Sequence, residues 1–227
     1  MWKRALSYVA DLLYPHTCLS CDSFVVDEAL VCPSCVSCIQ PLANTTEKID
    51  CTHTMTVIAA SRYEGPLVRL VMGKQWRQIG SARVLGKLVA ARLQSLSSVS
   101  APTSGVHFDV MIPVPLHWRR YAWRGYNQAY EVAREVRKRC HIPLLRPFYR
   151  VRHTPHQATL PKGQRNKNMV GAFAPCDSWE RAQKALRNKH VLLIDDVYTT
   201  GATVRQLAKC VLRAGAASVT VAVACRA

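Results

Sequence analysis

Two adjacent carboxylates at the end of a hydrophobic run are the residues of this chain best suited to chemistry. The segment Val191 to Thr203 reads VLLIDDVYTTGAT, so Asp195 and Asp196 are followed by a small, hydroxyl-rich stretch. Backbone amides and hydroxyls at the start of a helix can converge on a phosphate group. Carboxylates one sugar-length away can accept hydrogen bonds from ribose hydroxyls, directly or through a hydrated Mg²⁺. The pattern therefore predicts a site for a phosphorylated sugar.

The elements around these acids place the predicted site at one edge of a sheet. The run Val191 to Ile194 is typical of a strand buried on both faces, and Val204 to Ala214 has helical spacing. A loop between a parallel strand and the next helix lies at the carboxyl edge of the sheet, where such folds bind ligands. The residues expected to hold a phosphate there are Thr199, Thr200, Gly201, Ala202 and Thr203.

The whole segment Val191 to Thr203 resembles the phosphoribosyl pyrophosphate (PRPP) signature of type I phosphoribosyltransferases. That signature has four hydrophobic residues, two acids, and then a loop rich in threonine and glycine. The resemblance implies that Asp195 and Asp196 hold the ribose hydroxyls of PRPP together with Mg²⁺, and that the loop holds the 5-phosphate. The alternative is a buried strand that ends at a helix N-cap with two solvated acids.

A second polar segment follows an apolar strand expected at Phe108 to Pro113. It carries three arginines at spacings suited to a pyrophosphate, the group that leaves when PRPP reacts: Arg119, Arg120 and Arg124. Phosphoribosyltransferases have a pyrophosphate-binding loop at this place. The alternative is an ordinary basic turn in which Trp118 and Trp123 anchor the core.

A long polar loop between apparent strands is the third candidate part of the site. Loops of this length are usually functional or disordered. Its candidate residues are Thr154, Gln157, Lys162, Arg165, Lys167 and Asn168. As a lid, the loop would exclude water while a ribosyl cation forms. Its basic residues could instead follow a nucleic-acid backbone, and both interpretations stay open.

Positive charge is concentrated in the larger, later part of the chain. The formal net charge is +17, with four basic and seven acidic residues up to Glu64 and 27 basic and seven acidic residues after it. Nine basic residues and no carboxylate lie between Glu135 and Asp177. Such a field attracts polyanions, so single-stranded DNA is a predicted partner, although a merely solvated basic surface is the alternative. The aromatic residues that could stack on its bases are Trp76, Trp118, Trp123 and Tyr126.

Two Cys-x-x-Cys pairs near the N-terminus predict a metal site, formed by Cys18, Cys21, Cys32 and Cys35. Such pairs suit a tetrahedral structural Zn²⁺, because each pair turns two thiolates toward one point. Cys38 repeats the interval and competes with Cys35 as the fourth ligand. No apolar run approaches the ~18 residues of a membrane span, and no signal peptide precedes the cysteines. We therefore expect a soluble, cytoplasmic protein.

Alternating strand and helix patterns predict an α/β fold with a doubly wound parallel sheet. We expect strands over residues 56–63, 108–113, 144–151, 191–194 and 218–225, and helices over 66–74, 81–96, 127–139 and 204–214. An N-terminal helix and the cysteine-rich zinc-binding module should occupy residues 1–54. A type I phosphoribosyltransferase-like domain should occupy residues 55–227.

Taken along the chain, these motifs resemble the ComF/GntX family of phosphoribosyltransferase-like proteins. The motifs are the cysteine pairs, YEGPL from Tyr63, IPVPL from Ile112, RGYNQ from Arg124, the lid residues and the PRPP signature. The resemblance implies a protein of natural transformation that handles incoming single-stranded DNA in the cytoplasm, with DNA-uptake and processing proteins as partners.

The residues leave two other functions open: an active Mg²⁺-dependent phosphoribosyltransferase with an unknown acceptor, and a non-catalytic PRPP-sensing regulator. Transferases that act on 6-oxopurines carry an acid near position 199. Thr199 cannot serve as a general base at neutral pH, which argues against that substrate class.

Overall fold

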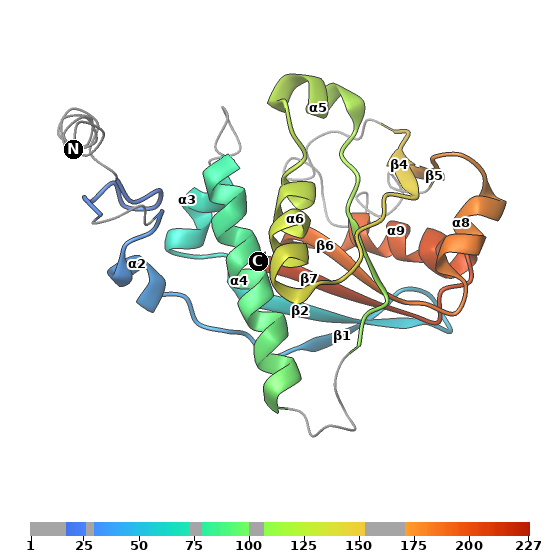
Figure 1. Cartoon of the computed structure of the whole chain (residues 1–227), viewed down its shortest axis with the longest axis horizontal. Coiled ribbons are helices and arrows are strands. Elements are labelled where there is room, and N and C mark those ends of the chain that lie inside the picture. Colours follow the sequence, from blue (N-terminus) through green and yellow to red (C-terminus); the bar gives the residue numbers. More distant parts are fainter. Residues whose placement is uncertain (1–16, 26–29, 73–78, 100–106, 153–170) are drawn as a thin grey trace, which may run out of the picture.

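The computed structural model describes residues 17–25, 30–72, 79–99, 107–152 and 171–227 (Figure 1). A five-stranded sheet forms its centre, in the order β1 (Thr45–Lys48), β2 (Thr54–Arg62), β7 (Ser218–Arg226), β6 (His190–Tyr198), β3 (Val110–Pro113). The last four strands are parallel and β1 pairs antiparallel to β2. The predicted α/β fold is therefore confirmed.

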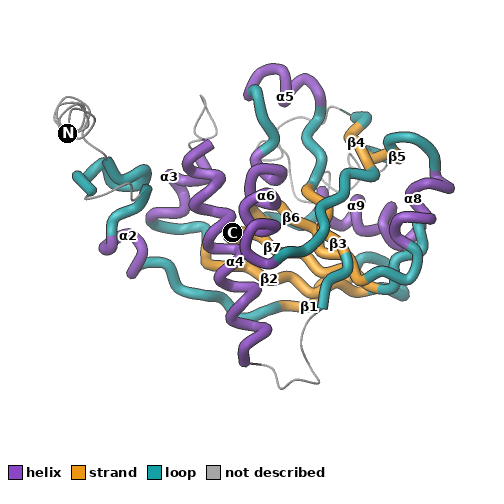
Figure 2. Tube along the Cα trace, in the orientation of Figure 1, coloured by secondary structure: helices purple, strands orange, loops and turns teal. Residues whose placement is uncertain are grey.

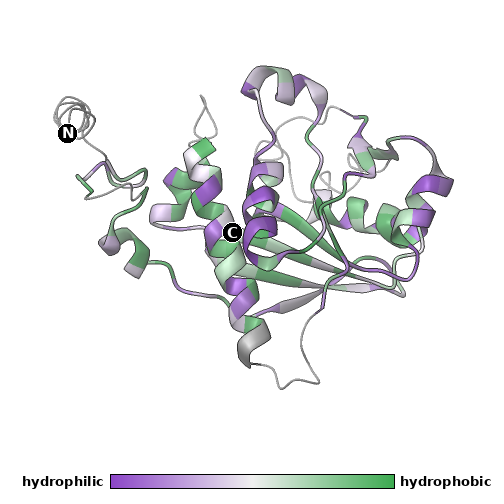
Figure 3. Cartoon of the chain, in the orientation of Figure 1, coloured by the Kyte–Doolittle hydropathy of each residue, from purple (hydrophilic) through white to green (hydrophobic). Residues whose placement is uncertain are grey.

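Helices cover both faces of the sheet, which explains the unbroken apolar run in β6. Val191 and Leu193 pack with α8 (Trp179–Leu186) and α9 (Ala202–Arg213). Leu192 and Ile194 point the other way, because side chains alternate along a strand, and pack with α3 (Pro66–Met72), α4 (Ile79–Val99) and α6 (Gln128–Cys140). Figure 3 shows mostly apolar residues along the central strands and a mixture of apolar and polar residues along the helices.

The strand expected over residues 144–151 is wrong for most of its length. Only β4 (Phe148–Arg150) is a strand, and it pairs with β5 (Phe173–Pro175) in a separate two-stranded sheet (Figure 2). Leu144 forms a single parallel bridge beside Met111 of β3. Pro147 lacks the amide hydrogen that a continuous strand needs, so the chain leaves the central sheet there.

Several short elements were not expected from the sequence: α2 (Pro33–Ser37), α5 (Trp118–Arg124), α8, β1 and β5. Among the helices of the described ranges, none combines the length and apolar character that crossing a membrane requires.

The cysteine-rich segment packs against α3 and α4. Its Asp22 carboxylate accepts a hydrogen bond from Arg69 of α3 at 2.8 Å. Gly80 of α4 lies close to Leu19, since a Cβ atom on the glycine would be 3.4 Å from that side chain. The segment is thus held to the helices on one face of the sheet.

Candidate functional site

A cavity of about 380 Å³ lies at the carboxyl ends of the parallel strands. Residues that follow β2, β3 and β6 all contribute to its wall. Six residues predicted for the phosphorylated-sugar site line it: Arg120, Arg124, Asp195, Asp196, Thr199 and Thr203. The structure therefore brings the two predicted loops together around one space.

A larger cavity of about 740 Å³ lies near the start of β3 and contains none of the predicted site residues. Two of its polar groups already serve the fold. Asp109 accepts a hydrogen bond from the backbone of His190 at 2.7 Å, and Gln94 donates one to the carbonyl of Arg139 at 3.2 Å. We therefore place the candidate site in the smaller cavity.

The two acids lie within β6, because the strand continues to Tyr198. Asp195 is level with Val223 of β7 in the parallel ladder. Its Oδ1 accepts a hydrogen bond from the Asp196 backbone at 2.9 Å, and Asp196 Oδ1 accepts one from Val197 at 2.9 Å. Both acids are partly buried on the cavity wall. Pairing with β7 and these local hydrogen bonds limit the movement of both acids.

Glycine is needed at position 201 for two reasons. Its φ angle is +68°, a left-handed conformation that costs an L-residue about 1–2 kcal/mol. A Cβ atom there would also lie 2.2 Å from the hydroxyl oxygen of Tyr198. The Tyr198 ring is buried directly under the loop, and burial raises the pKa of its hydroxyl. In the described part of the chain, that hydroxyl has no hydrogen-bond partner.

The arginines of the second loop lie on α5, a short helix inserted between β3 and α6. Gly125, with φ +78°, ends α5. Asn127 begins α6 by accepting a hydrogen bond from the Ala129 backbone at 3.1 Å, and its amide nitrogen donates to the Val114 carbonyl at 3.0 Å. Asn127 thus ties the chain that enters α5 to the chain that leaves it, which fixes α5 over the cavity.

The three predicted arginines differ in their positions relative to the cavity. Arg120 and Arg124 line the cavity. Burial, and then the charge of Arg124, lowers the pKa of Arg120. Arg119 is exposed and lies over the ring of Trp118, 5.4 Å from its centre, and it is not part of the described cavity wall.

Arg150 is a cavity residue that sequence reasoning missed. It comes from β4 and is only 7% exposed. Burial, and then the charge of Arg120, lowers its pKa to about 10, and the charge of Asp195 opposes the change. Phe148 and Arg150 both point inward with the period of a strand. The sequence could have indicated the buried position of Arg150 through this alternation. The many basic residues around it instead suggested an exposed basic segment.

The cavity wall carries two kinds of polar group. Three arginines, Arg120, Arg124 and Arg150, suit a polyanion such as pyrophosphate. Two carboxylates and the hydroxyl groups of Thr199 and Thr203 suit a sugar diol and a phosphate.

Comparisons with known proteins place this arrangement in a family. Residues 123–227 match the phosphoribosyl transferase domain family. The DNA utilization protein YhgH of Salmonella typhi is 30% identical over 171 residues, which cover 75% of this chain and 71% of that protein. YhgH of Escherichia coli O157:H7 is 27% identical over 219 residues, covering 92% of this chain and 89% of its own length. Competence protein F of Haemophilus influenzae is 34% identical over 108 residues, covering 47% of this chain and 45% of that protein.

The chain belongs to the ComF family of phosphoribosyltransferase-like proteins. Its fold is accordingly a type I phosphoribosyltransferase-like α/β fold. The family resemblance of the motifs is confirmed.

The RGYNQ motif of this ComF-family chain has a structural explanation at each position. Arg124 lines the cavity, Gly125 ends α5, Tyr126 is buried and Asn127 holds the loop. Gln128 is buried on the cavity wall, and its side-chain oxygen has no hydrogen-bond partner among the described residues. This oxygen is an acceptor that a ligand in the cavity could satisfy.

The aromatic residues proposed for stacking separate into different groups. Trp118 and Trp123 are 65% and 62% exposed, so the alternative that they anchor the core is wrong. Tyr126 is buried in the packed interior, and we therefore remove it from the stacking candidates. Trp76 and the predicted lid residues lie outside the described residues: Thr154, Gln157, Lys162, Arg165, Lys167 and Asn168.

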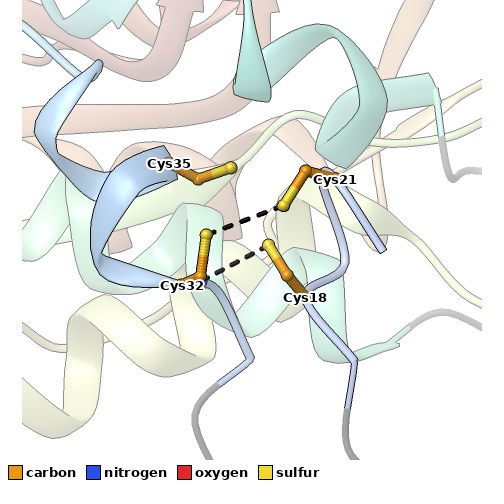
Figure 4. A group of neighbouring side chains, drawn as sticks. All are labelled: Cys18, Cys21, Cys32 and Cys35. Atoms are coloured by element: carbon orange, nitrogen blue, oxygen red, sulfur yellow. Dashed lines mark hydrogen bonds between the residues drawn. The ribbon is translucent and has the colours of Figure 1, made fainter. Parts of the chain in front are cut away.

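Four cysteines of the ComF-family chain gather in one cluster, and their sulfur atoms all lie within 4.8 Å of one another: Cys18, Cys21, Cys32 and Cys35 (Figure 4). The sulfurs of Cys21 and Cys32 are 3.6 Å apart. Sulfurs bound to one tetrahedral zinc at ~2.3 Å are ~3.8 Å apart, so the cluster fits this ion. The backbone of Cys32 also donates to the Cys18 sulfur at 3.3 Å.

Cys38 is not part of this cluster. It is exposed, and its thiol donates to the carbonyl of Ser34 at 3.2 Å. The fourth cysteine of the cluster is therefore Cys35 and not Cys38.

Proposed function

We propose that this ComF-family chain handles incoming single-stranded DNA during natural transformation, and that its cavity binds PRPP with Mg²⁺. The observation that supports PRPP most directly is the convergence of two acids, a phosphate-type loop and three arginines around one cavity. A polyanion with a ribose between two phosphate-bearing ends matches these three kinds of group.

Each part of the cavity has a distinct role in this proposal. The loop from Thr199 to Thr203 holds the 5-phosphate, and Asp195 and Asp196 accept hydrogen bonds from the ribose hydroxyls. Arg120, Arg124 and Arg150 hold the pyrophosphate. Bound Mg²⁺ would neutralise part of the pyrophosphate charge.

Single-stranded DNA is supported by an exposed aromatic surface in a strongly basic chain. Trp118 and Trp123 present their rings to solvent beside Arg119. Stacking on aromatic rings is tolerant of base sequence, as transport of arbitrary DNA requires. The relatives named DNA utilization protein and Competence protein F point in the same direction. We further propose cytoplasmic DNA-uptake and processing proteins as partners.

The cysteine cluster has a structural role in the proposal. Four thiolates would close the coordination sphere of Zn²⁺ and leave no open position for chemistry. The ion would fold the segment that packs against α3 and α4.

PRPP binding is tested by calorimetry in Mg²⁺ with the variants Asp195→Asn and Asp196→Asn. Each removes a charged acceptor without a change of shape, so we expect affinity to fall at least about tenfold. Asp177→Asn is the matched control, because Asp177 is exposed and paired with Arg181 outside the cavity. Unchanged binding in both cavity variants would remove the acids from the proposed site.

DNA binding is tested by titrating a labelled oligothymidylate at rising salt. Affinity should fall with a slope of about −0.7 per phosphate contact in a plot of log K against log salt. Affinity that is independent of salt would contradict electrostatic binding.

Phosphoribosyl transfer is a second candidate activity. Tyr63, Val71 and Leu116 add largely apolar surface to the cavity wall, against which a flat acceptor could lie. Release of pyrophosphate from PRPP only when an acceptor is added would support transfer. Binding without release for every nucleobase tested would favour a PRPP-sensing role.

A further inference from the structure

The helix α5 carries two kinds of binding group on one short segment. Arg120 and Arg124 are partly buried and line the cavity. Trp118, Tyr121 and Trp123 are exposed, the tyrosine by 54%. Figure 1 shows α5 standing apart from the sheet, at the top of the view above α6. One element therefore has an inner face toward a polyanion site and an outer face of aromatic rings.

The two faces are close enough for their ligands to affect each other. An α-helix with its side chains is only ~10–12 Å across. The Debye length is ~8 Å at physiological ionic strength and ~10 Å at 0.1 M salt. Two anions bound on opposite sides of α5 are therefore separated by about one screening length. Their repulsion would be reduced by salt but not abolished.

Hydrogen bonds hold the two ends of α5 in place. Asn127 joins the chain after α5 to the Val114 carbonyl before it, at 3.0 Å. Gly125 closes the helix with a hydrogen bond from its amide to the Tyr121 carbonyl at 2.7 Å. A ligand on either face therefore acts on one group of arginines and rings, and these hydrogen bonds oppose a movement of the helix that would relieve the repulsion.

We propose that single-stranded DNA on the outer face of α5 and a polyanion in the cavity weaken each other's binding. This inference rests on the proposed function and adds its regulation. Arginines that are neutralised by pyrophosphate no longer attract the DNA backbone, and bound DNA likewise lowers the positive potential at the cavity. PRPP would then promote release of DNA from α5.

The proposal is tested by measuring the affinity for DNA in the presence of PRPP and the affinity for PRPP in the presence of DNA. The Kd of a labelled oligothymidylate is measured by fluorescence anisotropy at constant Mg²⁺ with rising PRPP, and the Kd of PRPP by calorimetry with and without the oligonucleotide. We expect each ligand to weaken the other by about five- to twentyfold at low salt. Linkage requires the same factor in both directions, and the factor should shrink as salt rises. Sulfate at matched ionic strength is the control for general screening.

Substitutions in α5 test whether this helix binds the DNA. Replacing both Trp118 and Trp123 with alanine should weaken DNA binding several-fold and leave PRPP affinity in the absence of DNA unchanged. Phe24→Ala is the matched control, because Phe24 is an exposed ring of the cysteine-rich segment. Equal DNA affinity in the double variant and the control would contradict the proposal that Trp118 and Trp123 bind DNA.

The outcomes separate this inference from the proposed function. If both ligands bind and neither changes the affinity of the other, the antagonism is wrong and the proposed function stands. If DNA affinity falls without a plateau as PRPP rises, the ligands compete for one site, and the two-face arrangement is wrong. If neither ligand binds, the proposed function itself fails.

Discussion

Replacing Arg150 with methionine should make the free protein more stable and its binding of pyrophosphate weaker. The pKa of Arg150 is lowered from 12.5 to about 10, chiefly by burial. The folded protein therefore holds this proton less tightly than the unfolded chain does, so the charge opposes folding at every pH below about 10. The difference corresponds to roughly 3 kcal/mol.

Part of the stabilisation expected from removing the buried charge will be lost, because the substitution also removes favourable contacts of the guanidinium group. The Arg150 guanidinium lies 6.0 Å from the centre of the Phe173 ring, and Asp195 interacts favourably with its charge. Methionine has a similar apolar length, so we expect little cavity formation. A net stabilisation of about 2 kcal/mol corresponds to a Tm increase of about 4–8 °C in a chain of this size.

Thermal unfolding with and without pyrophosphate and Mg²⁺ measures both effects. The wild-type Tm should rise with pyrophosphate, whereas that of Arg150→Met should start higher and respond less. Arg134→Met is the control, since Arg134 is an exposed partner of Glu131 outside the cavity. A lower Tm together with an unchanged response to pyrophosphate would refute the reasoning.

Three further predictions concern the loop and the cysteine cluster. Gly201→Ala should destabilise the fold by about 2 kcal/mol or more, because its Cβ would overlap Tyr198 at a left-handed φ; denaturant unfolding measures this, and an unchanged midpoint would contradict it. Tyr198→Phe should be neutral or stabilising by about 1 kcal/mol in the same assay, since it removes a buried hydroxyl without a partner among the described residues; a clear loss of stability would show that the hydroxyl has a partner. Cys35→Ser should lose zinc in elemental analysis while Cys38→Ser keeps one ion per chain, and equal zinc contents would contradict the assigned cluster.

The part of the cavity that we propose for the ribose and its phosphate was predictable because its residues are contiguous. A run buried on both faces, two acids and a glycine loop specify a strand, its end and the next helix without reference to the rest of the chain. Only the strand end differed, since β6 continues through both acids to Tyr198. Local hydrogen bonds and the β7 ladder extend it, and no sequence pattern shows the length of a ladder.

The part of the cavity that we propose for the pyrophosphate was only partly predictable because it depends on tertiary contacts. Arg120 and Arg124 were identified from spacing, but Arg119, equally basic and adjacent, lies over Trp118 on the outer side of α5. Arg150 reaches the cavity from a hairpin far along the chain. Its burial depends on the pairing of β4 with β5, which local propensity does not determine.

The cysteine cluster was likewise only partly predictable from the sequence. Equal Cys-x-x-Cys spacing left Cys35 and Cys38 as alternatives. The short helix α2 decides between them, because Cys35 is buried within it, whereas Cys38 caps its end and faces solvent.

A crystal structure of the protein with PRPP and Mg²⁺ tests the central claim most directly. We predict that the 5-phosphate lies against Thr199 to Thr203, the ribose hydroxyls against Asp195 and Asp196, and the pyrophosphate among Arg120, Arg124 and Arg150. PRPP bound elsewhere, or a cavity still empty of PRPP at saturating concentration, would contradict the account.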